Sequence, residues 1–412
     1  MTKTEKTILR TLAAHYLECA NSDQNLFNIT AHRSVNDLQG ARPIVLISEI
    51  PWHEMNIENE LTLQCKQPVL REAEQFFRRE LYKWKHMPAD MVLPPYYSVQ
   101  KIIHSTGCGL NASFNDETSK PGSQVASHLY EDQLRCFEDL EKLHNETITY
   151  DQTATIQQFE CVADAIGDVI PVKITGIASG YETACKIWDD ISTFKSLEDL
   201  LVGLIDEPEF MHAIADKLTN ILLDKYRQYD ALNLWNANAY DCHSTAALSN
   251  SLPCNAEHPT RKNIWGRGLA QILATVSPAM HAEFDTAYQI KALAGFGLVY
   301  YGCCEPLHHK IEKIEKIPNL RKISITPWAD VDVAAEIIGK RYVLASKPNP
   351  AHFVGAAFDE AAARAELQRI VNACRRNSCS CDIVMKDIST VGGKPENLFR
   401  WQKIAMEEVE RL

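Results

Sequence analysis

Four apolar runs near the C-terminus each end in an unusual polar segment: LVYY-GCCE at 298–305, KISI-TPWAD at 322–330, YVLA-SKPNP at 342–350 and IVM-KDIS at 383–389. Stretches of helical character separate the runs. Repeated strand–helix units of this kind predict a parallel sheet. In a closed β/α barrel the chemistry lies at the carboxyl ends of the strands. Here those ends carry thiols, carboxylates, lysines and a tryptophan, which indicates a barrel enzyme.

Further strand candidates lie upstream at 43–50, 90–93, 170–175 and 231–240. A total of about eight strands predicts an α/β fold of the (β/α)8 TIM-barrel type in a single domain. The expected organisation is an N-terminal helical extension over 1–42 followed by the barrel over 43–412. The Gly-, Ser- and Asn-rich stretch 107–127 is expected to form a loop over one end of the barrel. An open doubly wound sheet is the alternative, although no Gly-x-Gly-x-x-Gly turn or phosphate loop supports nucleotide binding.

Composition limits the function. The 412 residues carry a formal net charge of −12, which argues against a general nucleic-acid binder because phosphate neutralisation needs surplus Lys and Arg. Thirteen cysteines are scattered along the chain, a pattern that favours a reducing compartment over a disulfide framework. No signal peptide or run of about 20 apolar residues is found. The expectation is a cytoplasmic enzyme with a small-molecule substrate and no membrane or nucleic-acid partner.

The sharpest local signal is the adjacent pair Cys303-Cys304 at a strand end. A thiolate there could bind zinc together with an imidazole. His243, after the candidate strand 231–240, is the expected partner, with Asp241 beside it for proton transfer. These three residues are therefore the predicted metal ligands: His243, Cys303 and Cys304. The alternative is a pair of thiols buried in a tightly packed strand.

The other strand ends supply candidates for substrate binding. Lys347, in a rigid Lys-Pro-Asn-Pro segment with Asn349, could bind a carboxylate or phosphate as a point charge. Lys386 could bind a ligand or pair with Asp387, which could transfer a proton. Trp328 offers a flat apolar wall. An exposed lysine, a plain salt bridge and a core cap are the respective alternatives.

A second cluster follows the first strong strand. Glu49, Trp52 and His53 lie within a few positions of one another, so they could share a site, and Tyr97 would line the same mouth. Surface exposure of a lone His and packing of the aromatic rings are the competing interpretations.

Taken together, these motifs resemble the uroporphyrinogen decarboxylase-like barrels. The likeness lies in Gly302-Cys303-Cys304-Glu305-Pro306-Leu307 and in the segments 323–330, 347–350 and 386–391. The resemblance implies a β/α barrel with one of two chemistries. One is decarboxylation of a porphyrinogen, and the other is zinc-dependent methyl transfer involving a corrinoid protein or a thiol. It also implies that the barrels can pair as a homodimer.

The chain departs from both branches of that superfamily. It has no Arg-rich N-terminal segment of the decarboxylases, and Asp241-Cys242-His243 has the wrong order for the His-x-Cys of the methyltransferases. Gly266-Arg267 stand where an acidic pair is common. Three hypotheses follow: a zinc methyltransferase with cobalamin carried by a partner protein, a metal-free lyase or decarboxylase acting on a carboxylated molecule, and a non-catalytic binding barrel. The lyase hypothesis predicts a basic pocket floor.

Overall fold

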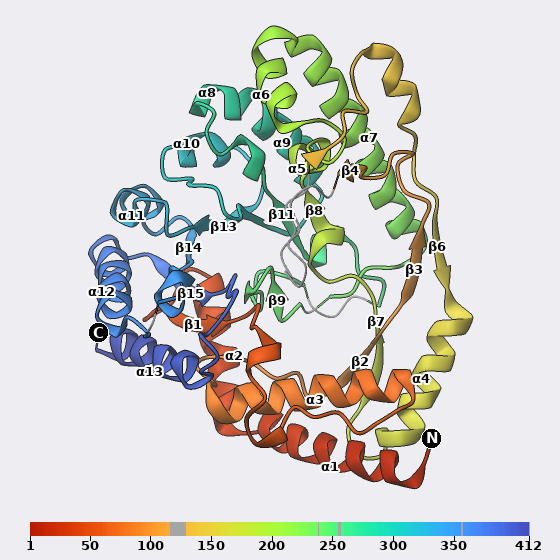
Figure 1. Ribbon diagram of the computed structural model, residues 1–412, viewed down its shortest axis with the longest axis vertical. Coiled ribbons are helices and arrows are strands. Elements are labelled where there is room, and N and C mark those ends of the chain that lie inside the picture. The colour runs from red at the N-terminus through yellow and green to blue at the C-terminus, as the bar shows by residue number, and fades with distance from the viewer. Residues whose placement is uncertain (116–128, 238, 254–256, 356, 412) are drawn as a thin grey trace.

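The centre of the molecule is a parallel sheet of seven strands in the order β1-β15-β14-β13-β12-β11-β8 (Figure 1). A computed structural model of the chain describes residues 1–115, 129–237, 239–253, 257–355 and 357–411. The strands are β1 (Ile44–Ile47), β8 (Ala184–Cys185), β11 (Trp265–Gly268), β12 (Leu298–Tyr301), β13 (Leu320–Ile325), β14 (Val343–Ser346) and β15 (Ser380–Met385). Every neighbouring pair is parallel, so the predicted α/β class and the four C-terminal strand–helix units are confirmed.

The first strand of this sheet pairs with the last, as in a barrel. Ile44 lies opposite Asp382 and Ile47 opposite Met385. Within the described residues, however, the edge strands β1 and β8 are not paired with each other, so closure into an eight-stranded barrel is not shown. Most of the predicted loop at 107–127, from 116 onward, lies outside the described residues.

The remaining strands form short pairs outside this sheet. β2 (Tyr97–Gln100) is parallel to β7 (Val172–Thr175), whereas β3 (Ile102–Ser105) with β6 (Ile148–Asp151) and β4 (Phe114–Asn115) with β5 (Leu129–Tyr130) are antiparallel. Two predicted strands are absent. Residues 90–93 are irregular because buried Asp90 accepts hydrogen bonds from the Arg42 guanidinium and the Val45 amide. In the described part of 231–240, only Trp235 forms a single bridge, to Ile177.

Helices surround the strands. Their bounds are α1 (Lys3–Ala20), α2 (Asp23–Asn36), α3 (Pro68–His86), α4 (Gln152–Ile166), α5 (Ile187–Ile191), α6 (Leu197–Asp206), α7 (Pro208–Ala231), α8 (Pro278–His281), α9 (Ala287–Leu293), α10 (Ile311–Ile314), α11 (Val331–Ile338), α12 (Glu360–Asn377) and α13 (Glu396–Glu410). Helices α1 and α3 lie side by side and enclose a second apolar core with α4 (Figure 1). No helix among the described residues is both long and apolar enough to cross a bilayer.

A short antiparallel hairpin lies against the sheet and carries a predicted site residue. β9 (Asp241–Cys242) and β10 (Thr245–Ala246) are joined by the two-residue turn His243-Ser244. The Ala246 carbonyl accepts hydrogen bonds from Asn36 on α2 and from Lys322 on β13. Lys322 also forms a fully buried ion pair with Asp382 of β15. The hairpin is thereby fixed to residues from both ends of the chain.

Candidate active site

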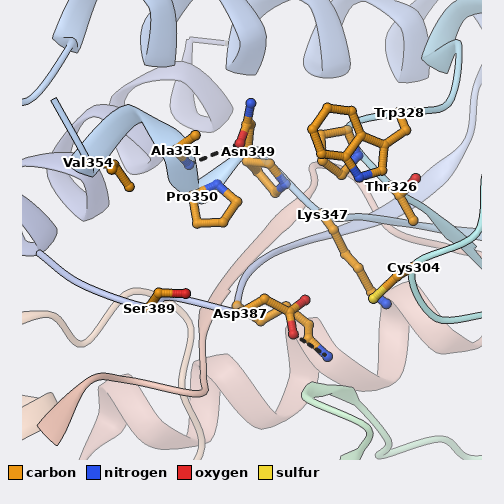
Figure 2. A pocket seen from close by; sticks show the side chains of 13 residues that line it. Cys304, Thr326, Trp328, Lys347, Asn349, Pro350, Ala351, Val354, Asp387 and Ser389 are labelled. Carbon is orange, nitrogen blue, oxygen red and sulfur yellow. Dashed lines mark hydrogen bonds and ion pairs between the residues drawn. The ribbon is translucent and has the colours of Figure 1, made fainter. Parts of the chain in front are cut away.

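The carboxyl ends of β12, β13, β14 and β15 surround a cavity of about 350 Å³ (Figure 2). Six residues singled out from the sequence line it: Cys304, Trp328, Lys347, Asn349, Lys386 and Asp387. They lie far apart in the sequence and meet because parallel strands place their carboxyl ends at one edge. The complete lining is Cys304, Thr326, Pro327, Trp328, Lys347, Pro348, Asn349, Pro350, Ala351, Val354, Lys386, Asp387 and Ser389.

The loop after β12 is held in one conformation by polar contacts around Cys303. Its amide donates to Glu305 Oε2 at 2.9 Å, and its carbonyl accepts from Ser324 Oγ at 3.0 Å and Lys347 Nζ at 2.6 Å. Gly302 has φ +107°, and a Cβ there would come within 2.6 Å of Leu307. Only glycine suits this backbone, which places Cys303 beneath the exposed Cys304 with their sulfurs 3.7 Å apart.

His243 reaches the same place from the hairpin turn. Both turn residues have positive φ, 49° for His243 and 70° for Ser244, as a type I′ turn requires. Such turns prefer Asn, Asp and Gly, so His and Ser hold the conformation at a cost of about 1–3 kcal/mol each. The turn brings His243 Nε2 to 3.3 Å from Cys303 Sγ. Non-glycine residues with positive φ also occur nearby at Glu49 and Asp387, and strain of this kind clusters at functional sites.

Three buried cations converge around His243 and Cys303. Arg267 on β11 is 1% exposed and places Nη2 2.9 Å from His243 Nε2, while Lys386, 3% exposed, places Nζ at 3.2 Å. Lys347 is 4% exposed and contacts the Cys303 carbonyl. Neither Arg267 nor Lys347 has a carboxylate within salt-bridge distance among the described residues. The lyase hypothesis predicted such a basic floor, and in a chain of net charge −12 it is a local feature.

These surroundings set the protonation of the imidazole and the two thiols. Burial, then the charges of Arg267, Lys347 and Lys386, strongly lower the pKa of His243, which is neutral. The hydrogen bond with Cys304, supported by Lys347 and Arg267, lowers the pKa of Cys303 to about 6, although burial opposes this. The pKa of Cys304 is raised, chiefly by the same hydrogen bond. At neutral pH the pair therefore shares one proton, and Cys303 is the thiolate.

A carboxyl pair lies at the base of the cavity. Glu49 Oε1 is 2.9 Å from Lys386 Nζ, and Glu49 Oε2 accepts from the Asp387 amide at 3.2 Å. Burial and the hydrogen bond with Glu49 raise the pKa of Asp387. Burial also acts to raise the pKa of Glu49, but hydrogen bonds from Asp387 and Lys386 outweigh it, and the net shift is downward. Asp387 thus retains the proton more strongly than an ordinary aspartate and faces the cavity.

The predicted zinc ligands meet, but their contacts do not suit a zinc ion. Arg267 and Lys386 can only donate, so the lone pair of His243 Nε2 is already directed at cations. Arg267 is buried, so a dication at Nε2 would face its charge with little screening by water. Among the described residues, no group of three or more His, Cys, Asp or Glu side chains is arranged to hold a metal. The residues therefore do not fit zinc in this arrangement.

Several predicted site residues lie elsewhere. Trp52 packs edge-on against Tyr82 and, with His53, lines a separate depression beside α3. Tyr97 is buried against Phe76 and Phe77. The expected place of these three residues in the cavity is wrong, because Trp52 and His53 lie beside α3 and the Tyr97 ring packs in the second apolar core.

Two other predicted residues lie near the site, but their contacts differ from those expected from the sequence. Asp241 lies on β9, and its side chain is exposed to solvent. In the described structure its carboxylate interacts with the backbone of Ser244 and not with His243. Asn349 lines the cavity, but its side chain accepts from the Ala351 amide and caps a short 3₁₀ helix, Pro350–Phe353.

Sequence reasoning did not assign a role to two residues that the site depends on. Arg267 was noted only as a departure from the superfamily pattern, yet its Nε and Nη1 atoms are buried without a hydrogen-bond partner among the described residues. Thr326 lines the cavity, and its buried Oγ1 likewise lacks a partner within the described ranges. The signal for Arg267 was a charged residue inside the buried strand Trp265–Gly268, where charges are rare. Nothing in the sequence distinguishes Thr326.

Comparison with known proteins adds little to this geometry. No known protein family matches the chain, and no curated protein is significantly similar to it. Among solved structures, the chain is similar to a methyltransferase from Methanosarcina mazei at 11% identity and a TM-score of 0.49. The alignment covers 92% of this chain and 98% of that one. At this level of similarity, neither the activity nor the site residues of that enzyme transfer to this chain.

Proposed function

We propose that this chain is an enzyme of the methyltransferase type in which the Cys303-Cys304 pair accepts a methyl group. The observation that carries the proposal is that one cavity is lined by Cys304, which shares a proton with the Cys303 thiolate, and by Asp387, a carboxyl whose pKa is raised. Cys304 and Asp387 line the cavity, and the charge of Asp387 raises the pKa of Cys304, which reflects their proximity. A nucleophile and an acid around an apolar space are the two groups that alkyl transfer to sulfur requires.

The step balances with these residues alone. The thiolate of the pair attacks the methyl carbon, and the bond from that carbon to its oxygen, nitrogen or sulfur breaks. The leaving atom keeps the electron pair and takes the proton of Asp387, which becomes a carboxylate beside Lys386. Glu49 and Lys386 hold Asp387 in place. Turnover needs an acceptor that removes the methyl group, for which a free thiol or a corrinoid protein docked over the mouth is proposed.

The test is single-turnover labelling of the thiol pair. Aryl methyl ethers, methylated amines and methylated sulfides with an isotopic methyl group are incubated with the protein, and peptides are analysed by mass spectrometry. At least one class is expected to label Cys303 or Cys304. Asp387→Asn is expected to slow labelling by about 10²-fold because the leaving atom loses its acid. Asp206→Asn, at the exposed last residue of α6, is the matched control.

Two results would contradict the proposal. One is the absence of label from all three donor classes while Cys303 still reacts with iodoacetamide. The other is label on a different residue. Metal analysis of the same samples tests the alternative with zinc. If the wild type holds stoichiometric zinc, and His243→Ala and Cys303→Ser lose it, the group that activates the methyl donor is a Lewis acid and not the general acid Asp387.

A carboxy-lyase is the second candidate, and the basic floor favours it. Lys347 would bind a substrate carboxylate, a neighbouring carboxylate would leave as CO2, and Asp241 or Asp387 would protonate the carbon that keeps the electron pair. Release of labelled CO2 from carboxylated substrates, without methyl label on the thiols, would establish this reaction in place of methyl transfer.

A further inference from the structure

The cavity combines apolar walls with the cation Lys347, which has no carboxylate within salt-bridge distance in the described part of the chain. Trp328 is 70% exposed, and it faces the cavity from the end of β13 (Figure 2). Val354, which is also largely exposed, and the two prolines Pro348 and Pro350 line the cavity as well. An indole of this exposure contributes little to the core, and large apolar groups left exposed around a hollow mark binding sites.

The cavity has few polar groups, and each has a defined position. Lys347 extends to the Cys304 end of the cavity (Figure 2), and its Nζ donates to the Cys303 carbonyl, which leaves two N–H groups of the ammonium. Lys386, in contrast, is neutralised by Glu49. Thr326 Oγ1 is buried at the cavity wall, and no described residue forms a hydrogen bond with it. A buried cation and an unpartnered hydroxyl both carry a cost that a ligand with an anionic end would remove.

From these contacts we infer that the substrate is a single-ring aromatic acid. Its flat apolar body packs on Trp328 and the prolines, and its carboxylate binds Lys347 with Thr326 Oγ donating a second hydrogen bond. A cavity of about 350 Å³ is at the small end of ligand pockets, which suits one ring better than a fused system or a macrocycle. That this ligand is a substrate rests on the proposed function. The inference adds the chemical class of the ligand.

Isothermal titration of the full chain with benzoate, benzamide and acetate tests the inference. Benzoate is expected to bind saturably, with benzamide and acetate each at least about tenfold weaker, because one lacks the charge and the other the ring. Lys347→Met and Trp328→Ala are each expected to weaken benzoate binding about tenfold. Trp328→Phe, which keeps a flat ring, should retain most of the affinity.

Lys316→Met is the matched control, since this exposed lysine precedes β13 at the opposite end of the strand. Equal binding of benzoate and benzamide, no benzoate binding by the wild type, or wild-type affinity in both Lys347→Met and Trp328→Ala would overturn the inference. Trp328→Ala remains informative if Lys347→Met fails to fold, because an exposed side chain is removed. Benzoate binding does not require methyl transfer. Binding without methyl label therefore rejects the proposed reaction alone, and label without benzoate binding rejects the substrate class alone.

Discussion

Replacing Cys304 by alanine is expected to slow alkylation of Cys303 at pH 6 by about fivefold, which corresponds to a rise of about one unit in the pKa of Cys303. The hydrogen bond from Cys304 is the largest contribution to the low pKa of Cys303, near 6. Without it, burial raises the pKa and the thiol holds its proton to higher pH. The thiolate is the reactive form, so the rate falls below the new pKa and changes little well above it.

The measurement is the rate of iodoacetamide modification of Cys303 between pH 5 and 9, followed on the peptide by mass spectrometry. The wild type should reach half its maximal rate near pH 6, and the variant at a higher pH. Cys136→Ala removes an exposed thiol elsewhere and controls for general changes in cysteine reactivity. An unchanged midpoint in Cys304→Ala would show that the two thiols do not share a proton.

Replacing Lys322 by methionine is expected to lower the free energy of unfolding by about 3–5 kcal/mol, since it leaves Asp382 buried without a counter-ion. Lys322 and Asp382 are both fully buried, with Nζ 2.5 Å from Oδ2. Lys322 also donates to the Ala246 carbonyl at 2.7 Å. The substitution therefore removes both the ion pair and an anchor of the hairpin that carries His243.

Urea denaturation measures this effect, and its pH dependence gives a second check. Burial already raises the pKa of Asp382, and loss of Lys322 raises it further. The folded variant then binds a proton that the unfolded chain, with an aspartate pKa of 3.8, releases. Its stability must therefore fall as pH rises above that value. Lys322→Met combined with Asp382→Leu should recover most of the loss, since an apolar pair can replace a buried ion pair. A single variant as stable as the wild type at neutral pH would contradict the expected cost.

The sheet and the hairpin differ in how far the sequence predicts them. Runs such as Lys322–Ile325 and Ile383–Met385 are apolar, short and separated by helical stretches, so each run specifies a buried parallel strand locally. The segment 231–240, also predicted as a strand, contains three asparagines, and in its described part only Trp235 forms a bridge, to Ile177, before the hairpin begins. The hairpin is held by the Asn36 and Lys322 side chains, which donate hydrogen bonds to the Ala246 carbonyl. Both residues lie far from the hairpin in the sequence, so a local pattern does not reveal these contacts.

For the site, the amino-acid sequence by itself determined that Cys303, Cys304, Lys347 and Asp387 follow strands, and hence that they would meet at one edge. It could not determine what charge surrounds them, because that depends on distances between elements. Only the tertiary structure placed Arg267 and Lys386 against His243, gave Cys303 its thiolate character and opposed the zinc that the residue types alone suggested. Local pattern fixes the direction of a strand, whereas protonation and metal binding depend on the sum of nearby charges and burial, which are properties of the folded chain.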